Sequence, residues 1–347
     1  MEISSAILTV QFWFPDINCA AFVTVFLLGI ALVNLFGITF YSESQVFCST
    51  IKIIALIIFI ITAIIINVGG GPNKKYYGSE TWRNPGAFFN GFHGYCGVLQ
   101  LVTYNFSGIE VIGQTANEAV NPRKDIPVAT NNVSILVFMF HFVSLLVVSF
   151  IVPYTDSNLA FASGVNASPF VIACKLAGIN GFANFMNSII MISIFASGNN
   201  NVYGGSRTLL GLVEEKQAFQ WLGYVDSFNR PLAGIAVSLA FGLFAYISTN
   251  TAKARFFFLW MVSMTGLSAI FTWGSICAAH IRFRKAWGLK GHTVEELPYI
   301  APFGVYGSYI GLLGWLLVLI AIFYGMISYL HYYYHHHHHH QHNDYLL

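Results

Sequence analysis

Charged residues are scarce in this sequence. Asp, Glu, Lys and Arg together make up 9% of the 347 residues, against roughly 25% in ordinary soluble domains. Hydrophobic residues make up 56% and aromatic residues 16%, so the composition excludes a water-soluble globular protein and indicates a protein in contact with membrane lipid. The net charge of +2 is spread through short segments between apolar runs. We therefore expect no nucleic-acid partner, because no block is basic enough to follow a phosphate backbone.

The sequence also lacks the short motifs that carry catalysis or bind metals. Its five cysteines stand singly and form no CxxC pair. No HExxH pattern, GxSxG motif or phosphate-binding glycine loop is present. We therefore expect neither an enzyme nor a resident cofactor or metal. The His-rich tail, residues 331–347, has three open interpretations: a purification tag, a natural low-complexity tract or a metal-binding segment.

Long apolar runs dominate what remains. Each is close to the length of about 20 residues that crosses about 30 Å of hydrocarbon as a helix. No linker rich in Gly, Ser or Pro separates them, so we predict a single all-α transmembrane domain over residues 1–347 with about eight spans. The runs cover residues 20–39, 45–68, 95–115, 133–152, 182–202 (with a lead-in at 169–177), 232–248, 256–280 and 307–330.

Lysine and arginine are unevenly distributed among the segments between these runs. Nine of them lie in residues 118–132, 203–231 and 281–306, whereas five lie in the opposite set of segments. The positive-inside rule therefore places the first set on the cytoplasmic side. Both ends of the chain would then face outside, which we expect of a chain whose leading helices are missing.

The third apolar run, 95–115, carries an acid in its middle. A carboxylate at mid-bilayer costs about 2.5–3.5 kcal/mol on insertion scales, so Glu110 should face protein or a water-filled cavity. Asn105, Ser107 and Gly108 together lower helix propensity, which predicts an unwound turn with open backbone groups. A half-helix after Gly108 would direct its positive end toward a substrate carboxylate. The alternative is that Gly108 allows close packing and Glu110 hydrogen-bonds to a neighbouring helix.

Lys52 lies about two turns inside the second run, within FCSTIKIIALI. Its ammonium group must either extend to the inner interface or find a partner among the helices. Because burial favours the neutral form of lysine, Lys52 could also exchange a proton during transport. Both interpretations stay open from the residues alone.

Residues 104–130 read YNFSGIEVIGQTANEAVNPRKDIPVAT. This segment resembles the fungal amino-acid permeases of the amino acid–polyamine–organocation superfamily, in which a stretch like FSFAGTELVG is followed by an acidic residue and ENPRKxIP. Other segments resemble the same family in the same order, up to about residue 328: NLFGITFYSE, IKIIALIIFI, NVYGGSRTLLGLVEE, GYVDSFNRPLAGIAVSLAFG, LSAIFTWGSICAAHIRFRKAW and ELPYIAPFGVYGS.

The resemblance implies helices 4 to 11 of an inverted-repeat fold with two sets of five helices, in which substrate binds between unwound first and sixth helices. The third run here corresponds to the sixth helix. The resemblance also implies proton-coupled amino-acid uptake at the plasma membrane, with amino acid, protons and membrane lipid as partners. The implied substrate-binding residues are Tyr104, Asn105, Phe106, Ser107, Gly108, Ile109 and Glu110, and the implied proton-coupling residues are Lys52 and Glu110.

This sequence departs from the family pattern at several places. Ser107 and Ile109 replace the alanine and threonine usual there, which leaves the preferred amino acid open. Lys52, by contrast, agrees with the family, because it matches a lysine that takes the place of a sodium ion in some relatives. The first and second family helices and most of the third are expected to be absent, and with the first helix half of the substrate site. The competing hypothesis is therefore a nontransporting membrane fragment or remnant that acts as a partner or sensor.

Overall fold

The computed structural model describes residues 1–343 apart from residues 89, 118, 160–167, 250 and 302. Side chains are described at most of these positions, the exceptions being 100, 114, 117, 251–256, 258–259 and 328–343. The side chains of the His-rich tail therefore lie outside the described residues, and the three interpretations of the tail stay open.

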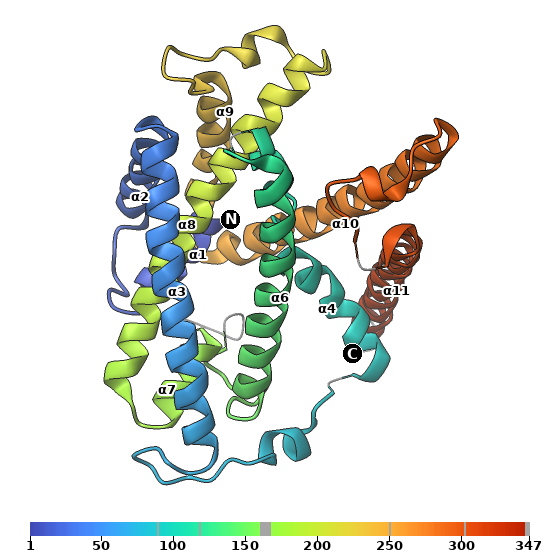
Figure 1. Ribbon diagram of the computed structural model, residues 1–347. Coiled ribbons are helices and arrows are strands. Elements are labelled where there is room, and N and C mark those ends of the chain that lie inside the picture. The colour runs from blue at the N-terminus through green and yellow to red at the C-terminus, as the bar shows by residue number, and fades with distance from the viewer. Residues whose placement is uncertain (89, 118, 160–167, 250, 302, 344–347) are drawn as a thin grey trace. The chain divides into compact units, whose positions relative to one another are not determined.

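Every regular element in the described part of the chain is helical (Figure 1). The sequence predicted this all-α class. The α-helices are α1 (Glu2–Val10), α2 (Cys19–Leu35), α3 (Ile38–Asn67), α4 (Gly91–Asn105), α5 (Val111–Gln114), α6 (Pro122–Ser149), α7 (Pro169–Leu176), α8 (Asn180–Glu214), α9 (Leu232–Gly242), α10 (Thr251–Leu289) and α11 (Gly304–Asn343).

Short turns of other helix types connect several of these elements. They are the π-helical turn η1 (Trp82–Gly86) and the 3-10 turns η2 (Thr115–Asn117), η3 (Gln220–Gly223), η4 (Leu243–Thr249) and η5 (Val294–Glu296).

Six helical segments in the described part are long and apolar enough to cross a membrane. The helix α2 is equally apolar in character but has only 17 residues. The third predicted span is divided into α4 and α5, as the sequence predicted for a discontinuous helix. The six segments are Ile38–Asn67, Pro122–Ser149, Asn180–Glu214, Leu232–Thr249, Trp260–Leu289 and Gly304–Ile327.

The contacts divide the chain into two compact units, the first of which comprises residues 1–87 and 132–258. Its central element is α8, which packs against α1, α2, α3, α7 and α9. One apolar cluster joins α3, α7 and α8 through residues such as Phe59, Cys174 and Met186. A second cluster joins α1 and α2 to α8 and α9, with Val23 and Val202 among its buried members.

Polar side chains on α8 bond to the helices around it. Asn199, which is 2% exposed, accepts a hydrogen bond of 3.1 Å from Asn34 of α2. Asn200 accepts one of 3.0 Å from the hydroxyl of Tyr41 on α3. Buried amides need such partners because an unpaired polar group in an apolar interior is costly. These asparagines therefore connect helices within the first unit.

The second unit comprises residues 88–131 and 259–347. Here α4 packs along α11, and a small apolar cluster combines Leu99, Ile270 and Ile322 from α4, α10 and α11. Gly325 of α11 lies against α4, since a Cβ added there would be 3.5 Å from the Cβ of Cys96. The broken helix belongs to this unit.

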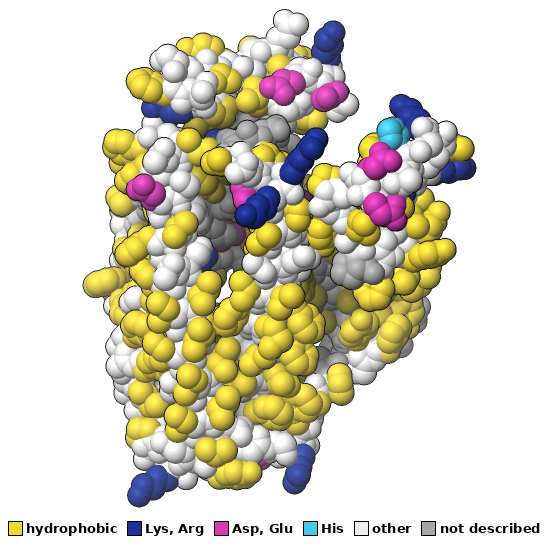
Figure 2. Space-filling model, viewed as in Figure 1, with side chains coloured by type: hydrophobic (Ala, Val, Ile, Leu, Met, Phe, Trp, Pro, Cys, Tyr) yellow, Lys and Arg dark blue, Asp and Glu magenta, His cyan; other side chains and the backbone are white. Residues whose placement is uncertain are grey.

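Hydrophobic side chains cover the middle of the long helices. On the face shown in Figure 2, they spread over the length of α3, whereas charged side chains gather toward helix ends. Residues of α3 such as Ile54, Ile61 and Ile64 are exposed. Exposed isoleucines at this density are costly in water and favourable against lipid tails. The chain is therefore a multi-pass membrane protein.

Gly234 allows α9 to approach α8 closely. A Cβ added at this residue would lie 2.8 Å from the carbonyl oxygen and 2.9 Å from the Cα of Ser206. Because both are backbone atoms, neither can move aside as a side chain can, so one helix would have to shift. Close backbone approach through small residues is a common way for membrane helices to pack.

We predict that Gly234→Ala destabilises the first unit by about 1–3 kcal/mol, the usual cost of overpacking. The measurement is thermal unfolding of the purified protein in detergent. Gly211→Ala on α8 is the matched control, because an added Cβ there meets no atom within 4 Å. Equal melting temperatures for both variants would contradict the close contact between α8 and α9.

Candidate functional site

The candidate substrate site is a break in the helical backbone. The helix α4 ends at Asn105, residues 106–110 form turns, and the single turn α5 begins at Val111. Gly108 has a φ of +100°, a region that residues with a Cβ rarely adopt. Glycine at this position therefore sets the direction in which the chain leaves α4.

Several side chains at the break bond to the backbone near them. The Nδ2 of Asn105 donates to the carbonyl of Leu101 over 3.0 Å, and the hydroxyl of Ser107 donates to the carbonyl of Tyr104 over 2.8 Å. The amide of Gly108 donates to Oε2 of Glu110 over 3.0 Å. The Glu110 carboxylate thus folds back over the break, and it bonds to no other described residue.

Other backbone groups at the break have no partner among the residues that the structure describes. Among the described residues, the amides of Ile109 and Glu110 donate no hydrogen bond, and the carbonyls of Asn105 and Ser107 accept none. Polar backbone groups without partners at membrane depth need water or a ligand. The break therefore offers both donors and acceptors to a small polar molecule.

The segment after the break is shorter than the half-helix that the sequence suggested. It consists of the four-residue α5 followed by the 3-10 turn η2. One turn of helix has little macrodipole, so an anion would be bound by the individual amides. All of residues 104–110 are partly buried except Asn105, which is exposed.

Lys52 lies in the first unit, inside α3, whereas the break lies in the second unit. Its side chain is partly buried. Among the described residues, no hydrogen bond or ion pair involves it. The carboxylate of Glu2 on α1 lies near enough to interact with it electrostatically, and both interpretations of Lys52 stay open.

A second polar site, a pocket in the first unit, is not predicted by any pattern in the sequence. It lies where α2 ends, α3 and α9 begin, and the C-terminal part of α8 passes. The residues that line it are far apart along the chain, and each of them alone looks like an ordinary residue at a helix end. The pocket is lined by Asn34, Gly37, Ile38, Tyr41, Tyr203, Arg207, Asn229, Arg230, Pro231 and Ile235.

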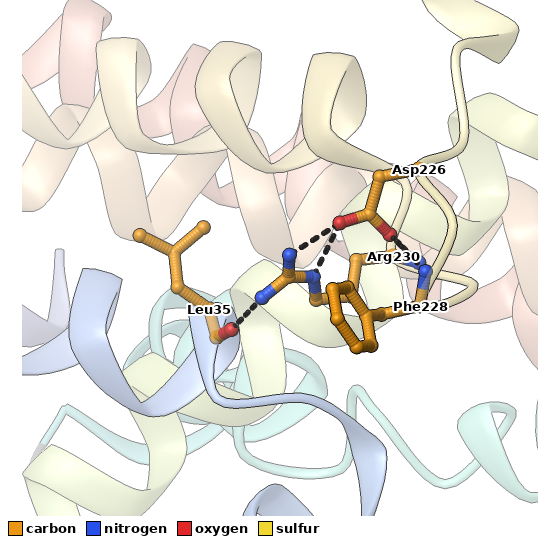
Figure 3. A network of polar contacts seen from close by, with 4 residues as sticks. All are labelled: Leu35, Asp226, Phe228 and Arg230. Atoms are coloured by element: carbon orange, nitrogen blue, oxygen red, sulfur yellow. Dashed lines mark hydrogen bonds and ion pairs between the residues drawn. The ribbon is translucent and has the colours of Figure 1, made fainter.

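Arg230 is the best-fixed cation of this pocket (Figure 3). Its Nε donates to Oδ2 of Asp226 over 2.6 Å, and its terminal nitrogens contact Asp226 and the carbonyl of Leu35 at the end of α2. The hydrogen bond from Arg230 also lowers the pKa of Asp226 below its ordinary value, with backbone amides assisting. The loop before α9 is thereby tied to the end of α2.

Comparison with known proteins identifies the family. The sequence model described as "Amino acid permease" matches residues 1–335. The chain belongs to the amino acid permease family. Its break at residues 106–110 therefore lies within the region matched by this family.

Three fungal relatives illustrate the similarity of this permease to others. It is 41% identical over 324 residues to "Amino-acid permease GAP5" of Candida albicans, covering 93% of this chain and 52% of the relative. It is 40% identical to "Amino-acid permease inda1" of Hypocrea atroviridis, covering 94% and 58%. It is 42% identical to "General amino-acid permease GAP1" of Saccharomyces cerevisiae, covering 93% and 55%. The chain thus spans about half the length of these relatives.

We predict that Gly108→Ala destabilises the break of this permease by about 1–3 kcal/mol, the cost of a strained backbone conformation. The reason is conformational alone, since an added Cβ at Gly108 meets no atom within 4 Å. The measurement is the melting temperature of the purified protein.

Gly113→Ala serves as the matched control. It lies in α5, meets no atom within 4 Å and has no positive φ. A Gly108→Ala protein as stable as the Gly113→Ala protein would show that the turn does not depend on glycine.

Proposed function

We propose that the whole protein carries amino acids across the plasma membrane together with protons, and that this chain supplies the broken helix of the substrate site. Membership of the amino acid permease family supports transport. The observation that carries the proposal is that, within the described part of the chain, the amides of Ile109 and Glu110 and the carbonyls of Asn105 and Ser107 have no hydrogen-bond partner. Discontinuous membrane helices use such groups to bind substrates.

An amino acid offers a carboxylate and an ammonium group, which match the two kinds of open backbone group. The amides of Ile109 and Glu110 would bind the carboxylate, and the carbonyls of Asn105 and Ser107 would accept from the ammonium group. The side chains of Ser107 and Ile109 would then lie next to the substrate side chain. Their size, larger than in the family pattern, would set which amino acids fit.

Glu110 would couple proton movement to substrate movement. Its carboxylate accepts a hydrogen bond from the amide of Gly108, so without substrate it occupies a place that suits a substrate carboxylate. Two carboxylates close together repel each other, which favours protonation of one of them. Substrate binding and proton uptake by Glu110 would therefore assist each other.

Lys52 would act as a second proton-coupling group on α3. Inside a membrane helix the low dielectric of the surroundings favours the neutral form of lysine. Loss and recovery of its proton during the cycle would change the charge within the helix bundle. In this proposal Lys52 acts by losing and regaining its proton, and not by carrying a permanent charge.

A second candidate function is that of a nontransporting membrane partner or sensor. The chain spans about half the length of each relative. A chimera resolves the two candidates. It adds to this chain those parts of the Saccharomyces general amino-acid permease that lie outside the matched region.

We predict that the chimera restores uptake of a labelled amino-acid mixture in permease-deficient yeast, and that Glu110→Gln lowers this uptake at least about tenfold, or about 1.4 kcal/mol. Glutamine retains an acceptor for the Gly108 amide but cannot bind a proton. The residual uptake should also lose its dependence on external pH. The amount of each chimera at the cell surface is measured in parallel with its uptake.

The controls separate a transport defect from a folding defect. Glu215→Gln removes an exposed acid at the end of α8 and should leave uptake unchanged. Normal uptake by the Glu110→Gln chimera would contradict the proposed role of Glu110. A chimera that reaches the surface and takes up no amino acid would favour the partner or sensor function.

Lys52 can be tested with two substitutions that differ in charge. Because arginine stays protonated in proteins, both Lys52→Arg and Lys52→Gln should lower uptake by the chimera about tenfold if the lysine must release its proton. Lys285→Gln, at an exposed position of α10, is the control. Full uptake with arginine and loss with glutamine would instead show a fixed positive charge.

A further inference from the structure

We propose that the end of α10, residues 282–290, binds the headgroups of anionic phospholipids, with phosphatidylserine as the model lipid. These residues are called the basic segment below. They lie in the second unit, and the proposal does not depend on the transport function. It is carried by a cluster of cations without ionic partners, by the continuity of this cluster with the lipid-facing side of α10, and by its distance from the other end of the span.

The basic segment carries four cations and no acid. They are Arg282, Arg284, Lys285 and Lys290, out of the 16 lysines and arginines of the chain. Arg284 is partly buried and the other three are exposed. In the described part of the chain, none of the four takes part in a hydrogen bond or an ion pair. Their charges are therefore available to an external anion.

Acids near the basic segment do not neutralise it. No aspartate or glutamate occurs from residue 251 to residue 294, and the next ones along the chain are Glu295 and Glu296. Glu296 is engaged in the turn after α10, where its Oε2 lies 2.8 Å from Nδ1 of His292 and its Oε1 accepts from the amide of Thr293 over 3.0 Å. Four cations against these two acids leave an excess of positive charge at this end of α10.

The exposed cations continue the lipid-facing side of α10. Met264 and Phe271 are 62% and 61% exposed, and apolar side chains exposed within a membrane span face lipid. Arg282 follows Met264 by 18 residues, which is about five turns of helix, so both side chains lie on the same side of α10. Lys285 and Leu289 share this side, three and seven positions after Arg282. The apolar side of the span therefore ends in cations.

The length of the span places these cations at a membrane surface. Trp260, at the start of the span, is 69% exposed, and tryptophan is typical of the interface. Arg282 lies 22 residues further along, or about 33 Å of helix, which matches the hydrocarbon thickness of about 30 Å. Lys285 and Lys290 follow within about another 12 Å, close to the Debye length of about 10 Å over which anionic headgroups attract cations.

The dipole of α10 does not account for the cluster. A helix dipole favours cations only within the last turn, and α10 ends at Leu289, whereas Arg282, Arg284 and Lys285 all precede that turn. The positive-inside rule assigns residues 281–306 to the cytoplasmic side, where anionic lipids gather. Clusters of lysine and arginine next to a membrane span attract such lipids. Four cations without ionic partners on this surface therefore fit anionic headgroups.

Fluorescence quenching by brominated lipids tests the proposal at the basic segment itself. Leu289→Trp places a reporter there at a position that is 80% exposed, so the fold should tolerate it. The purified chain is reconstituted into phosphatidylcholine vesicles that contain either brominated phosphatidylserine or brominated phosphatidylcholine. The signal of the parent chain is subtracted. Because bromine quenches by contact, the difference reports which lipid lies beside the reporter.

At low salt we expect brominated phosphatidylserine to associate with the reporter at least about threefold more strongly than brominated phosphatidylcholine. The preference should disappear at about 1 M salt, where the Debye length is about 3 Å. Equal quenching by the two lipids at low salt would overturn the proposal. Quenching by aqueous iodide and by neither lipid would also overturn it, and would assign the surface to a soluble acidic partner.

Substitutions in the Leu289→Trp chain locate the preference. Replacing Arg282, Lys285 and Lys290 together by glutamine should reduce it to less than about 1.5-fold. The charge-conserving exchange of the same three, Arg282→Lys, Lys285→Arg and Lys290→Arg, should retain it. Lys216→Gln, an exposed cation just beyond α8, should leave it unchanged.

A preference that survives the triple glutamine variant, or that is lost in the charge-conserving variant, would contradict binding by charge at this segment. If the triple glutamine variant folds poorly, the salt dependence of the Leu289→Trp chain still decides. A preference for phosphatidylserine that persists unchanged at high salt would overturn the proposal.

Discussion

Backbone N–H and C=O groups find no water in the hydrocarbon layer, so each must be bonded within the protein. This requirement accounts for the uniformly helical secondary structure of the described chain, because a helix bonds its own backbone. It also gives meaning to the interruption of the predicted span 95–115. At residues 106–110 the backbone leaves the helix, and the amides of Ile109 and Glu110 have no partner among the described residues. An interruption of this kind is tolerated only where protein or a water-filled cavity surrounds it.

The same requirement explains how far sequence reasoning reaches. The apolar run 45–68 predicts most of α3, and the helix begins earlier, at Ile38, because a helix continues through polar residues such as Ser42 and Glu43 once it has started. The break was predictable because Asn105, Ser107 and Gly108 weaken the helix beside an acid. Local composition is sufficient in both cases, since both features arise within one segment.

Features that join distant segments were beyond the reach of sequence reasoning. The pocket brings Gly37 and Arg207 together across 170 positions of the sequence. The sequence predicts on which side of the membrane its arginines lie. The shape of the pocket, however, depends on how α2, α3, α8 and α9 pack. The direction of the Glu110 carboxylate was equally hidden. Its bond to the Gly108 amide depends on the backbone angle at Gly108, and no residue pattern specifies that angle.

The position of α8 has a mechanical consequence. This helix packs against α1, α2, α3, α7 and α9, and asparagine bonds join it to α2 and α3. Sliding α8 past any one neighbour would disturb the others, and close-packed interiors shift between discrete arrangements instead of deforming smoothly. The helices packed around α8 therefore form a frame that moves only as one rigid body. Motions that open a path through the membrane would have to come from hinges outside this frame.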